Sequence, residues 1–427
     1  MLNGEIKMTP QIKQRIDQIR RGEVPEGYKK MKSDIIPEEW TSYLLSDIYT
    51  ERKESGIPSL PILTVSIHSG VSDGALDDDE LGKKVKRIED KTQYRTAHSG
   101  DLVFNMMRAW QGAIGVVRSD GLVSPAYIVA TPDKSAIYPP FMDYYMKTPQ
   151  MVNRIHRKSY GVTDFRLRLY WDSFAMIGCA MPPLPEQKKI AEILSAQDKL
   201  IALKEKLIEE KKRQKKYLMQ QLLTGKKRLP GFSGEWYTER LDDFCLFVGG
   251  GTPDTKNVEY WQGDIPWISS SDLRSDDLYN VNTNRYITND AVQSSATKKC
   301  PAGSILVVTR VGVGKVAIAP TELCTSQDFT SVIQNKYDNM YIAYAIYWLM
   351  QEKSTQVQGS SIKGVPSKEF QNYTVHIPPI NEQCAIVSVL SAIDREIDLL
   401  AHIIDQEKQK KKALMQLLLS GVVRVNV

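Results

Sequence analysis

The chain contains one long segment twice. Residues 182–201 read PPLPEQKKIAEILSAQDKLI, and residues 378–397 read PPINEQCAIVSVLSAIDREI. Pro378 lies 196 positions after Pro182. The same offset relates residues over most of the chain, among them Trp40 and Trp236, Phe174 and Phe370, Asp198 and Asp394, and Gly225 and Gly421. The chain is therefore an internal repeat whose anchors match while the segments between them differ.

Each copy is expected to begin a long helix. Proline suits the first turn because its φ is already helical, and Glu186 and Glu382 suit the positive helix end. Gly225 and Gly421 provide natural C-terminal stops. At about 1.5 Å per residue, a helix over residues 185–225 would be ~60 Å long.

Apolar residues advance along both helices by alternating threes and fours, which predicts a heptad seam. The seam consists of Ile190, Leu194, Ile201, Ile208, Leu218 and Leu222 in the first helix and Ile386, Leu390, Ile393, Ile397, Leu400, Ile404, Leu414 and Leu418 in the second. Gln197 and Lys204 interrupt the first seam, and Glu407 and Lys411 interrupt the second. We expect an intramolecular antiparallel coiled coil, with ordinary amphipathic helices packed on their own domains as the alternative.

The start of the chain resembles the end of a repeat. Thr9-Pro10 followed by isoleucines at helical spacing predicts a short capped helix that ends before Gly22. The order of Gly22 and Trp40 echoes that of Gly225 and Trp236. We expect this segment to complete a circular, pseudo-two-fold repeat. A frayed, solvent-exposed helix is the alternative.

Two segments of about 140 residues, at 41–181 and 237–377, are each the size of one domain. Short β-rich runs such as 101–106 and 304–308 and helices near 141–147 and 342–351 predict a mixed α/β (α+β) fold. The predicted limits are an N-terminal helical segment at 1–37, a first domain at 38–181, a central helix at 182–232, a second domain at 233–377, and a C-terminal helix and tail at 378–427.

Composition narrows the class of protein. The 42% hydrophobic and 25% charged residues of the 427-residue chain are typical of a soluble globular protein. Its apolar runs are too short to cross a membrane. Five cysteines without a CxxC pair favour a reducing cytoplasm over a disulfide framework or a zinc site. The net charge of +5 permits an acidic partner without requiring one.

A family resemblance rests on motifs in the second domain and on the repeated helices. In order these are Gly249-Gly-Gly-Thr-Pro253, Tyr260-Trp261, Ile265-Pro266-Trp267, Ser271-Asp272-Leu273, Arg310-x-Gly312-x-Gly314-Lys315 and Ser326-Gln327-Asp328. With the Pro-Pro-x-x-Glu-Gln helix starts, they resemble the specificity subunits of type I restriction–modification systems. The resemblance covers essentially the whole chain. It is weaker in the first domain, where Gly100, Arg108 and Gly112 take the places of Gly303, Arg310 and Gly312.

The resemblance implies a DNA sequence-specificity subunit without catalytic residues or a cofactor of its own. Each domain would be a target-recognition domain that reads one half of a bipartite, asymmetric site in double-stranded DNA, and the helices would set the spacer. Two modification subunits would carry S-adenosylmethionine and methylate adenine, and restriction subunits with translocase activity would join them. The helix starts, with Glu186, Gln187, Glu382 and Gln383, are the expected partner-binding positions.

Base reading requires Arg or Lys for guanine and Asn or Gln for adenine, surrounded by groups that bind phosphate. The candidates are Asn105, Arg108, Trp110 and Gln111 in the first domain and Thr252, Ser269, Ser270, Ser271, Arg310, Lys315, Gln327 and Lys363 in the second. Any one of them taken alone is also an ordinary surface or turn residue. Trp236, Trp261 and Trp267 are expected to pack rather than to stack on bases.

Two other classes of function remain as alternatives: a self-contained DNA-modifying enzyme, and a coiled-coil scaffold without sequence specificity. The sequence Tyr138-Pro-Pro-Phe141 has Tyr where an amino-methyltransferase needs a polar Asn or Asp, so it is interpreted as a helix start. Gly312-Val-Gly-Lys315 lacks the spacing of a phosphate-binding loop. The basic run at 211–216 is a solvated helix face or a contact for DNA or protein.

Overall fold

The computed structural model describes residues 9–31, 34–67, 70–72, 88–161, 163, 166–357 and 364–426. The chain divides into two compact units: unit 1 contains residues 1–203 and 404–427, and unit 2 contains residues 204–403. Each unit therefore holds one domain and one half of each long helix. Within the described ranges, no helix is both long enough and apolar enough to cross a membrane. The domain limits given above remain a prediction.

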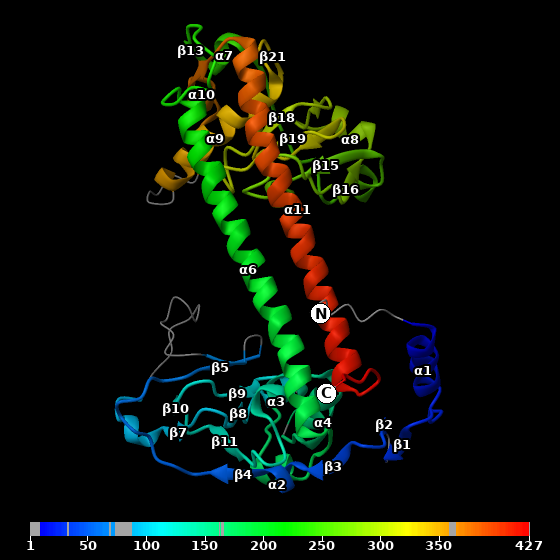
Figure 1. Ribbon diagram of the computed structural model, residues 1–427. Helices are drawn as coiled ribbons and strands as arrows, with labels where there is room; N and C mark the ends of the chain where they lie inside the picture. The colour runs from blue at the N-terminus through cyan, green and yellow to red at the C-terminus, as the bar shows by residue number, and fades with distance from the viewer. Residues whose placement is uncertain are drawn as a thin grey trace. The chain divides into compact units, whose positions relative to one another are not determined.

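The long helices are α6 (Leu184–Leu223) and α11 (Ile380–Leu419), each of 40 residues. Halves of the two helices lie side by side in each unit (Figure 1). In unit 1, Ile190 and Leu194 of α6 share a core with Leu418 and Leu414 of α11. In unit 2, Met219 and Leu222 of α6 share a core with Leu390 and Ile386 of α11. Numbers rise along one helix as they fall along the other, so the predicted antiparallel pairing is confirmed.

Polar residues that interrupt the seam find partners inside it. The side-chain amide of Gln197 donates to a carboxylate oxygen of Glu407 at 2.7 Å. Both residues belong to unit 1. A buried polar group costs little when its hydrogen bonds are made, and such a pair fixes the register of two helices. The sequence irregularity at these positions thus corresponds to a defined contact between α6 and α11.

Unit 1 contains a four-stranded antiparallel sheet in the order β4-β11-β8-β9 (Figure 1). Its strands and the smaller pairs are β1 (Tyr28–Met31) with β2 (Asp34–Pro37), β3 (Thr41–Leu44) with β12 (Gly178–Met181), β4 (Tyr49–Arg52), β5 (Val65–Ser66) with β6 (Gly70–Val71), β7 (Arg95–Ala97) with β10 (Gly121–Val123), β8 (Leu102–Asn105), β9 (Ile114–Val116) and β11 (Tyr127–Pro132). Its helices are α1 (Pro10–Arg20), α2 (Leu45–Ile48), α3 (Pro139–Tyr145), α4 (Pro149–Lys158) and α5 (Trp171–Ala175), with short 3₁₀ turns η1 (Lys91–Gln93) and η2 (Ala109–Gln111).

Unit 2 repeats the same sheet order as β14-β21-β18-β19 and adds a second sheet, β16-β15-β20-β17. Its strands are β13 (Tyr237–Arg240), β14 (Cys245–Gly249), β15 (Ile265–Ile268), β16 (Arg285–Ile287), β17 (Lys299–Cys300), β18 (Ile305–Val307), β19 (Val316–Ile318), β20 (Leu323–Thr325), β21 (Thr330–Asn335) and β22 (Thr374–Ile377). Its helices are α7 (Leu241–Phe244), α8 (Asn289–Gln293), α9 (Asn339–Val357) and α10 (Ser367–Gln371), with 3₁₀ turns η3 (Val258–Trp261) and η4 (Ser270–Asp272). The predicted α/β domains on paired long helices are confirmed.

One apolar core in each unit joins the domain to the helices. In unit 1, Phe104 of β8 and Phe141 of α3 belong to the same buried cluster as Ile190 of α6. In unit 2, Ile305 of β18 and Tyr341 of α9 belong to one cluster with Leu390 of α11. At about 25 cal/mol per Å² of buried apolar surface, these shared cores are a main source of stability. The sheet of each domain is thereby held on its own half of the helix pair.

The N-terminal segment lies against the end of α11. The guanidinium of Arg15 donates to the carbonyl of Val422 at 3.0 Å, and the hydroxyl of Tyr28 donates to the carbonyl of Gly421 at 2.7 Å. The residues that follow α11, from 420 on, occupy the repeat positions of those that follow α6, from 224 on, at the offset of 196. The N-terminal segment and the C-terminal tail are therefore in contact in unit 1, and the role of residues 1–37 in completing the repeat stays a prediction.

Candidate nucleic-acid interface

Four strands of unit 2 end on the same side of the domain. β14 and β18 run in the same direction because both pair antiparallel with β21, and β15 runs parallel to β20. Backbone hydrogen bonds join the segments that leave these strands: Gly251 N to Thr325 O at 2.8 Å, Ser326 N to Ile268 O at 2.8 Å, and Thr309 N to Asp328 O at 2.9 Å. Residues far apart in the sequence thus come together here.

Seven of the eight side chains predicted for the second domain lie on these segments, which we call polar edge 2: Thr252, Ser269, Ser270, Ser271, Arg310, Lys315 and Gln327. The hydroxyl of Thr252 donates to the side-chain oxygen of Gln327. The ammonium of Lys315 donates to the carbonyl of Ser270 at 2.7 Å. Each of these two hydrogen bonds joins segments that are far apart in the sequence. The eighth residue, Lys363, lies outside the described residues.

Arg285 of β16 belongs to polar edge 2 but was absent from the predicted set. Its guanidinium donates to the hydroxyl of Ser269 at 2.7 Å and pairs with the carboxylate of Asp272. It also lies over the ring of Trp267, 4.6 Å from the centroid. The feature that identifies Arg285 as part of this edge is the pairing of β16 with β15, which places Arg285 opposite Trp267. Trp267 itself is buried, as expected for a packing residue.

Glycines in polar edge 2 allow two backbone segments to lie close together and allow the chain to turn between two strands. A Cβ on Gly251 would lie 2.4 Å from the backbone nitrogen of Thr297, so only glycine fits between these segments. Gly312 and Gly314 have φ values of +88° and +102° in the turn that joins β18 to β19. The Gly-Val-Gly-Lys sequence is therefore a tight turn between two strands. Its lysine is held against Ser270.

The corresponding turn of unit 1 joins β8 to β9 and carries all four residues predicted there, which form polar edge 1: Asn105, Arg108, Trp110 and Gln111. The side-chain oxygen of Asn105 accepts from Met107 N at 2.9 Å, and the indole N–H of Trp110 donates to Met107 O at 3.0 Å. The Trp110 ring lies 5.7 Å from the ring of His156 on α4. These contacts fix the turn and leave Arg108 and Gln111 exposed.

The two polar edges overlap in their place in the fold but have unlike side chains. Edge 1 and the part of edge 2 with Arg310 and Lys315 occupy the turn between the third and fourth strands of a sheet with the same strand order. Edge 1 presents an arginine and two carboxamides, whereas edge 2 presents hydroxyls, an arginine, a lysine and a carboxamide. Arg, Lys, Asn and Gln are the side chains that distinguish base edges, and hydroxyls and cations bind phosphate oxygens. The edges therefore suit nucleic acid, with different preferences.

Comparison with known proteins gives a consistent result. The model of the family described as type I restriction modification DNA specificity domain matches residues 61–213 and again 233–409. The chain belongs to this family. A Methanocaldococcus jannaschii chain named as the specificity subunit of the type I restriction enzyme MjaX is 26% identical over 94% of this chain and 97% of its own length.

Two further relatives extend the comparison. The specificity subunit of the type I restriction enzyme EcoR124I/EcoR124II of Escherichia coli is 32% identical over 50% of this chain and 54% of its own length. A solved chain from a study of complex assembly and conformational transition in the type I system has 17% identity and a TM-score of 0.60. It covers 91% of this chain and 99% of its own. At that identity the structure supports the specificity-domain fold alone.

The Glu-Gln pair of each helix start is buried in this family member, although it was predicted to bind partners. In unit 1, Glu186 is 1% exposed and accepts hydrogen bonds from Trp40 and Arg424. Gln187 accepts from Tyr138 N at 2.8 Å and donates to Pro182 O at 2.9 Å. These side chains hold the start of α6 to α3 and to the C-terminal tail, so they present no surface to a partner.

Unit 2 repeats the arrangement at the offset of 196. Glu382 accepts from Trp236 at 3.0 Å and from Arg228. The side-chain oxygen of Gln383 accepts from Asp338 N at 3.0 Å, and its nitrogen donates to Pro378 O at 2.7 Å. The role of the Pro-Pro-x-x-Glu-Gln motif is thus internal: the acid binds a tail, and the amide binds the domain. We call each Trp–Glu–Arg set a helix-start clasp.

Two sequence patterns that resembled catalytic or DNA-binding motifs also have internal roles. Pro139 and Pro140 form the first turn of α3, and Tyr138 precedes them as the N-cap, so this stretch is a helix start as predicted. In the basic run, Lys211 pairs with Glu396 at 2.6 Å and Lys215 pairs with Asp394 at 2.6 Å. Part of the run therefore stabilises the helix pair of unit 2.

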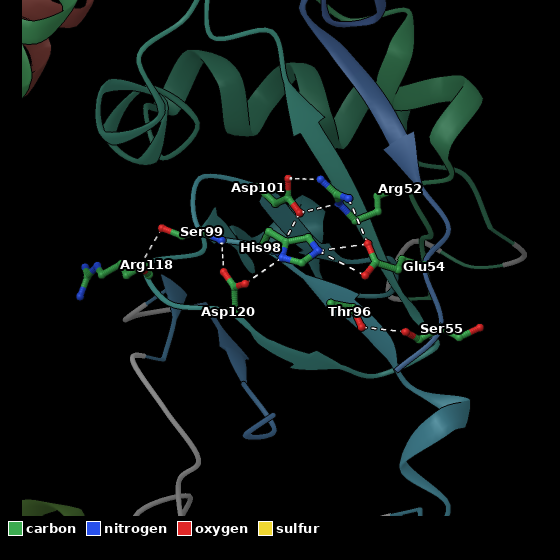
Figure 2. Close-up of polar contacts among 9 residues, drawn as sticks. All are labelled: Arg52, Glu54, Ser55, Thr96, His98, Ser99, Asp101, Arg118 and Asp120. Carbon is green, nitrogen blue, oxygen red and sulfur yellow. Dashed lines mark hydrogen bonds and ion pairs between the residues drawn. The ribbon is translucent and has the colours of Figure 1, made fainter. Parts of the chain in front are cut away.

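A polar cluster at the other end of β8 distinguishes unit 1 (Figure 2). The ring of His98 contacts Asp120 at 2.8 Å and Glu54 at 3.1 Å, and its backbone N–H donates to Asp101. Arg52 pairs with Asp101 at 2.8 Å. The hydrogen bond to Asp120 raises the pKa of His98 above its ordinary value, against the lowering effect of partial burial. The cluster joins β4, β7, β8 and β10 away from polar edge 1.

Proposed function

We propose that this chain is the DNA specificity subunit of a type I restriction–modification complex and that each polar edge contacts one half of a bipartite, asymmetric site. The observation that carries the proposal is the duplicated frame with unlike edges. Both domains have one strand order and one set of helix-start clasps, yet edge 1 and edge 2 differ in their exposed side chains. Two different readers on matched supports suit a target with two different halves.

Arg108 and Arg310 are the leading candidates for base contacts, one on each edge. Both are exposed and lie in the turn that follows the third strand of the sheet order. Arginine binds guanine through two parallel hydrogen bonds in the major groove, and Gln111 and Gln327 offer the amide pattern that adenine requires. Lys315 and the hydroxyls of edge 2 would bind phosphate and orient the domain.

The partners in this proposal are two modification subunits and, with them, restriction subunits. Leu203 on α6 in unit 1 and Leu399 on α11 in unit 2 occupy matching repeat positions and are 65% and 60% exposed. An exposed large apolar side chain at the same position of each unit suits two copies of one protein. The modification subunits would carry S-adenosylmethionine and methylate adenines flipped out of the duplex. The chain itself would be non-catalytic and act in the cytoplasm.

Sequencing of methylated bases in a host that carries the complete system tests the proposal. The expected result is adenine methylation at one bipartite motif with two unlike halves and a fixed spacer, lost when this chain is deleted. Methyl transfer by the purified chain alone would favour a self-contained enzyme. Binding to all DNA sequences with the same affinity and salt dependence would favour a scaffold without specificity.

A further inference from the structure

Unit 2 contains a buried hydrogen-bonded set of three residues where the domain meets the helix pair. The hydroxyl of Tyr344, on α9, donates to Asp394 of α11 at 2.6 Å. The other carboxylate oxygen of Asp394 pairs with the ammonium of Lys215, on α6, at 2.6 Å. Lys215 and Asp394 are only 7% and 11% exposed. The three residues come from three separate segments of the chain.

Unit 1 has the same set. The hydroxyl of Tyr144, on α3, donates to Asp198 of α6 at 2.7 Å, and Lys411 of α11 pairs with the other oxygen of Asp198 at 2.5 Å. Asp198 and Lys411 occupy the repeat positions of Asp394 and Lys215, at the offset of 196. We call each set a Tyr–Asp–Lys joint. In both units it connects a domain helix to the two long helices.

The joint has the chemistry of a positioning device. Burial raises the pKa of Tyr144 and of Tyr344, so both hydroxyls stay protonated and donate. A carboxylate with one oxygen on a tyrosine and the other on a lysine is fully paired, which a buried charge requires. Apolar contacts tolerate sliding, but hydrogen bonds to both oxygens of one carboxylate fix direction as well as distance. The joint thus fixes the angle between domain and helices.

The two joints differ in their surroundings. In unit 2, the hydroxyl of Tyr279 adds a hydrogen bond to that of Tyr344 at 2.9 Å. Lys215 also lies 5.2 Å from the ring of Tyr347. In unit 1, Lys411 and Asp198 are 27% and 41% exposed. Water screens charges at that exposure, so the joint of unit 1 is weaker.

The joint of unit 2 also continues to polar edge 2. One turn along α9 from Tyr347, the side-chain amide of Gln351 donates to Gly314 O at 2.9 Å. Gly314 precedes Lys315 in the turn between β18 and β19. The hydroxyl of Tyr347 and the amide of Gln351 both donate to Ser275 O at 3.1 Å. A chain of hydrogen-bonding residues on one helix therefore runs from the joint to the turn that carries Arg310.

We propose that the Tyr–Asp–Lys joints are positioning elements that hold each recognition domain at one angle on the helix pair, and that the joint of unit 2 thereby enforces the spacer length accepted between the half-sites. This inference rests on the proposed function. The tyrosines, aspartates and lysines are positioning residues, because none lies on a polar edge. A looser joint lets a domain rock, so a site with a longer or shorter spacer is penalised less.

Methylation of defined DNA duplexes tests the proposal with the full chain in complex with its modification subunits. The duplexes carry the native half-sites with the native spacer or with one base pair added or removed. Tyr344→Phe removes the hydroxyl and leaves the Asp394–Lys215 pair in place. We expect the preference for the native spacer to fall roughly fivefold, the factor that corresponds to one lost hydrogen bond of ~1 kcal/mol. Both half-sites stay the same.

Matched variants complete the design. Tyr144→Phe should reduce the preference by a smaller factor, and Tyr217→Phe on an exposed position of α6 should leave it unchanged. Tyr279→Phe, which removes only the outer hydroxyl, provides the test if Tyr344→Phe does not fold. An unchanged spacer preference in an assembled Tyr344→Phe complex would overturn the inference, as would altered bases in a half-site. If the wild-type complex methylates no bipartite site, the proposed function fails instead.

Discussion

Unit 1 and unit 2 hold their long helices with side chains at matching repeat positions, whereas their polar edges share few. Trp40, Glu186 and Arg424 correspond to Trp236, Glu382 and Arg228 at one offset, and each set makes the same contacts. The turns that carry Arg108 and Arg310, at 106–113 and 308–315, are equally long but differ in sequence. The contacts that hold the long helices are thus alike in the two units, and the side chains of the polar edges differ. The edges can therefore change without a change in the contacts that hold the helices.

The largest expected effect concerns the helix-start clasps, where the units are most alike. Arg424→Ala leaves the buried carboxylate of Glu186 without its cation, so we expect a loss of ~3 kcal/mol in unfolding free energy. Arg228→Ala should destabilise unit 2 in the same direction, because Glu382 is equally buried. Denaturant unfolding of the full chain measures both.

Arg213→Ala is the matched control, since this residue on α6 is 73% exposed and, among the residues that the structure describes, pairs only with Glu210. Its effect should stay within ~0.5 kcal/mol, as is usual for exposed positions. If Arg424→Ala behaves like this control, the clasp does not hold the C-terminal tail in solution. Different signs for Arg424→Ala and Arg228→Ala would break the likeness of the two frames.

The next effect concerns the edges, where the units differ. We expect Arg310→Ala and Arg108→Ala each to weaken binding of the assembled complex to its site about tenfold, within the ~1–3 kcal/mol of one base contact. Each should relax discrimination in one half-site, and not in the same one. Competition binding with DNA mutated in either half measures this. An equal loss on every sequence would instead indicate phosphate contacts.

The smallest effect is a pH dependence confined to unit 1. The pKa of His98 is raised in the folded chain by its hydrogen bond to Asp120. Its contribution to stability is complete below the unfolded pKa of about 6.5 and is lost as the pH rises through the higher folded pKa. Between pH 6 and pH 8.5, the wild-type chain should therefore lose more hydrogen-exchange protection in β7 and β10 than the His98→Gln variant does.

His376→Gln is the control in unit 2, because the ring of His376 contacts the hydroxyl of Thr238 and, in the described part of the chain, no carboxylate. This substitution should leave the pH dependence of β7 and β10 unaltered. If His98→Gln keeps the wild-type pH dependence, the cluster in Figure 2 is not its source.

Features that depend on nearby residues could be predicted from the sequence. The helix starts and stops of α6 and α11, their seam and the strands around residues 102–105 and 305–307 follow from local spacing and turn residues. The turns that carry the candidate residues could also be predicted, because glycines mark them in the sequence. The contact between Thr252 and Gln327 on one edge could not be predicted in this way, because it depends on how four strands pair.

Features built from distant segments could not be predicted. Arg285 reaches polar edge 2 only through the pairing of β16 with β15. Glu186 and Gln187 were expected to bind partner subunits, but the groups that they bind lie in other segments of this chain. The Tyr–Asp–Lys joints combine three segments each. Only the offset that relates Asp198 to Asp394 and Lys215 to Lys411 could have singled them out.

In the proposed function, each polar edge reads its own half-site on a shared frame. The most direct test replaces residues 237–377 with the corresponding segment of a relative that has a different target and sequences the methylated bases of the host. We expect a new sequence in one half of the motif, with the other half and the spacer unchanged. A change in both halves, or in neither, would contradict it.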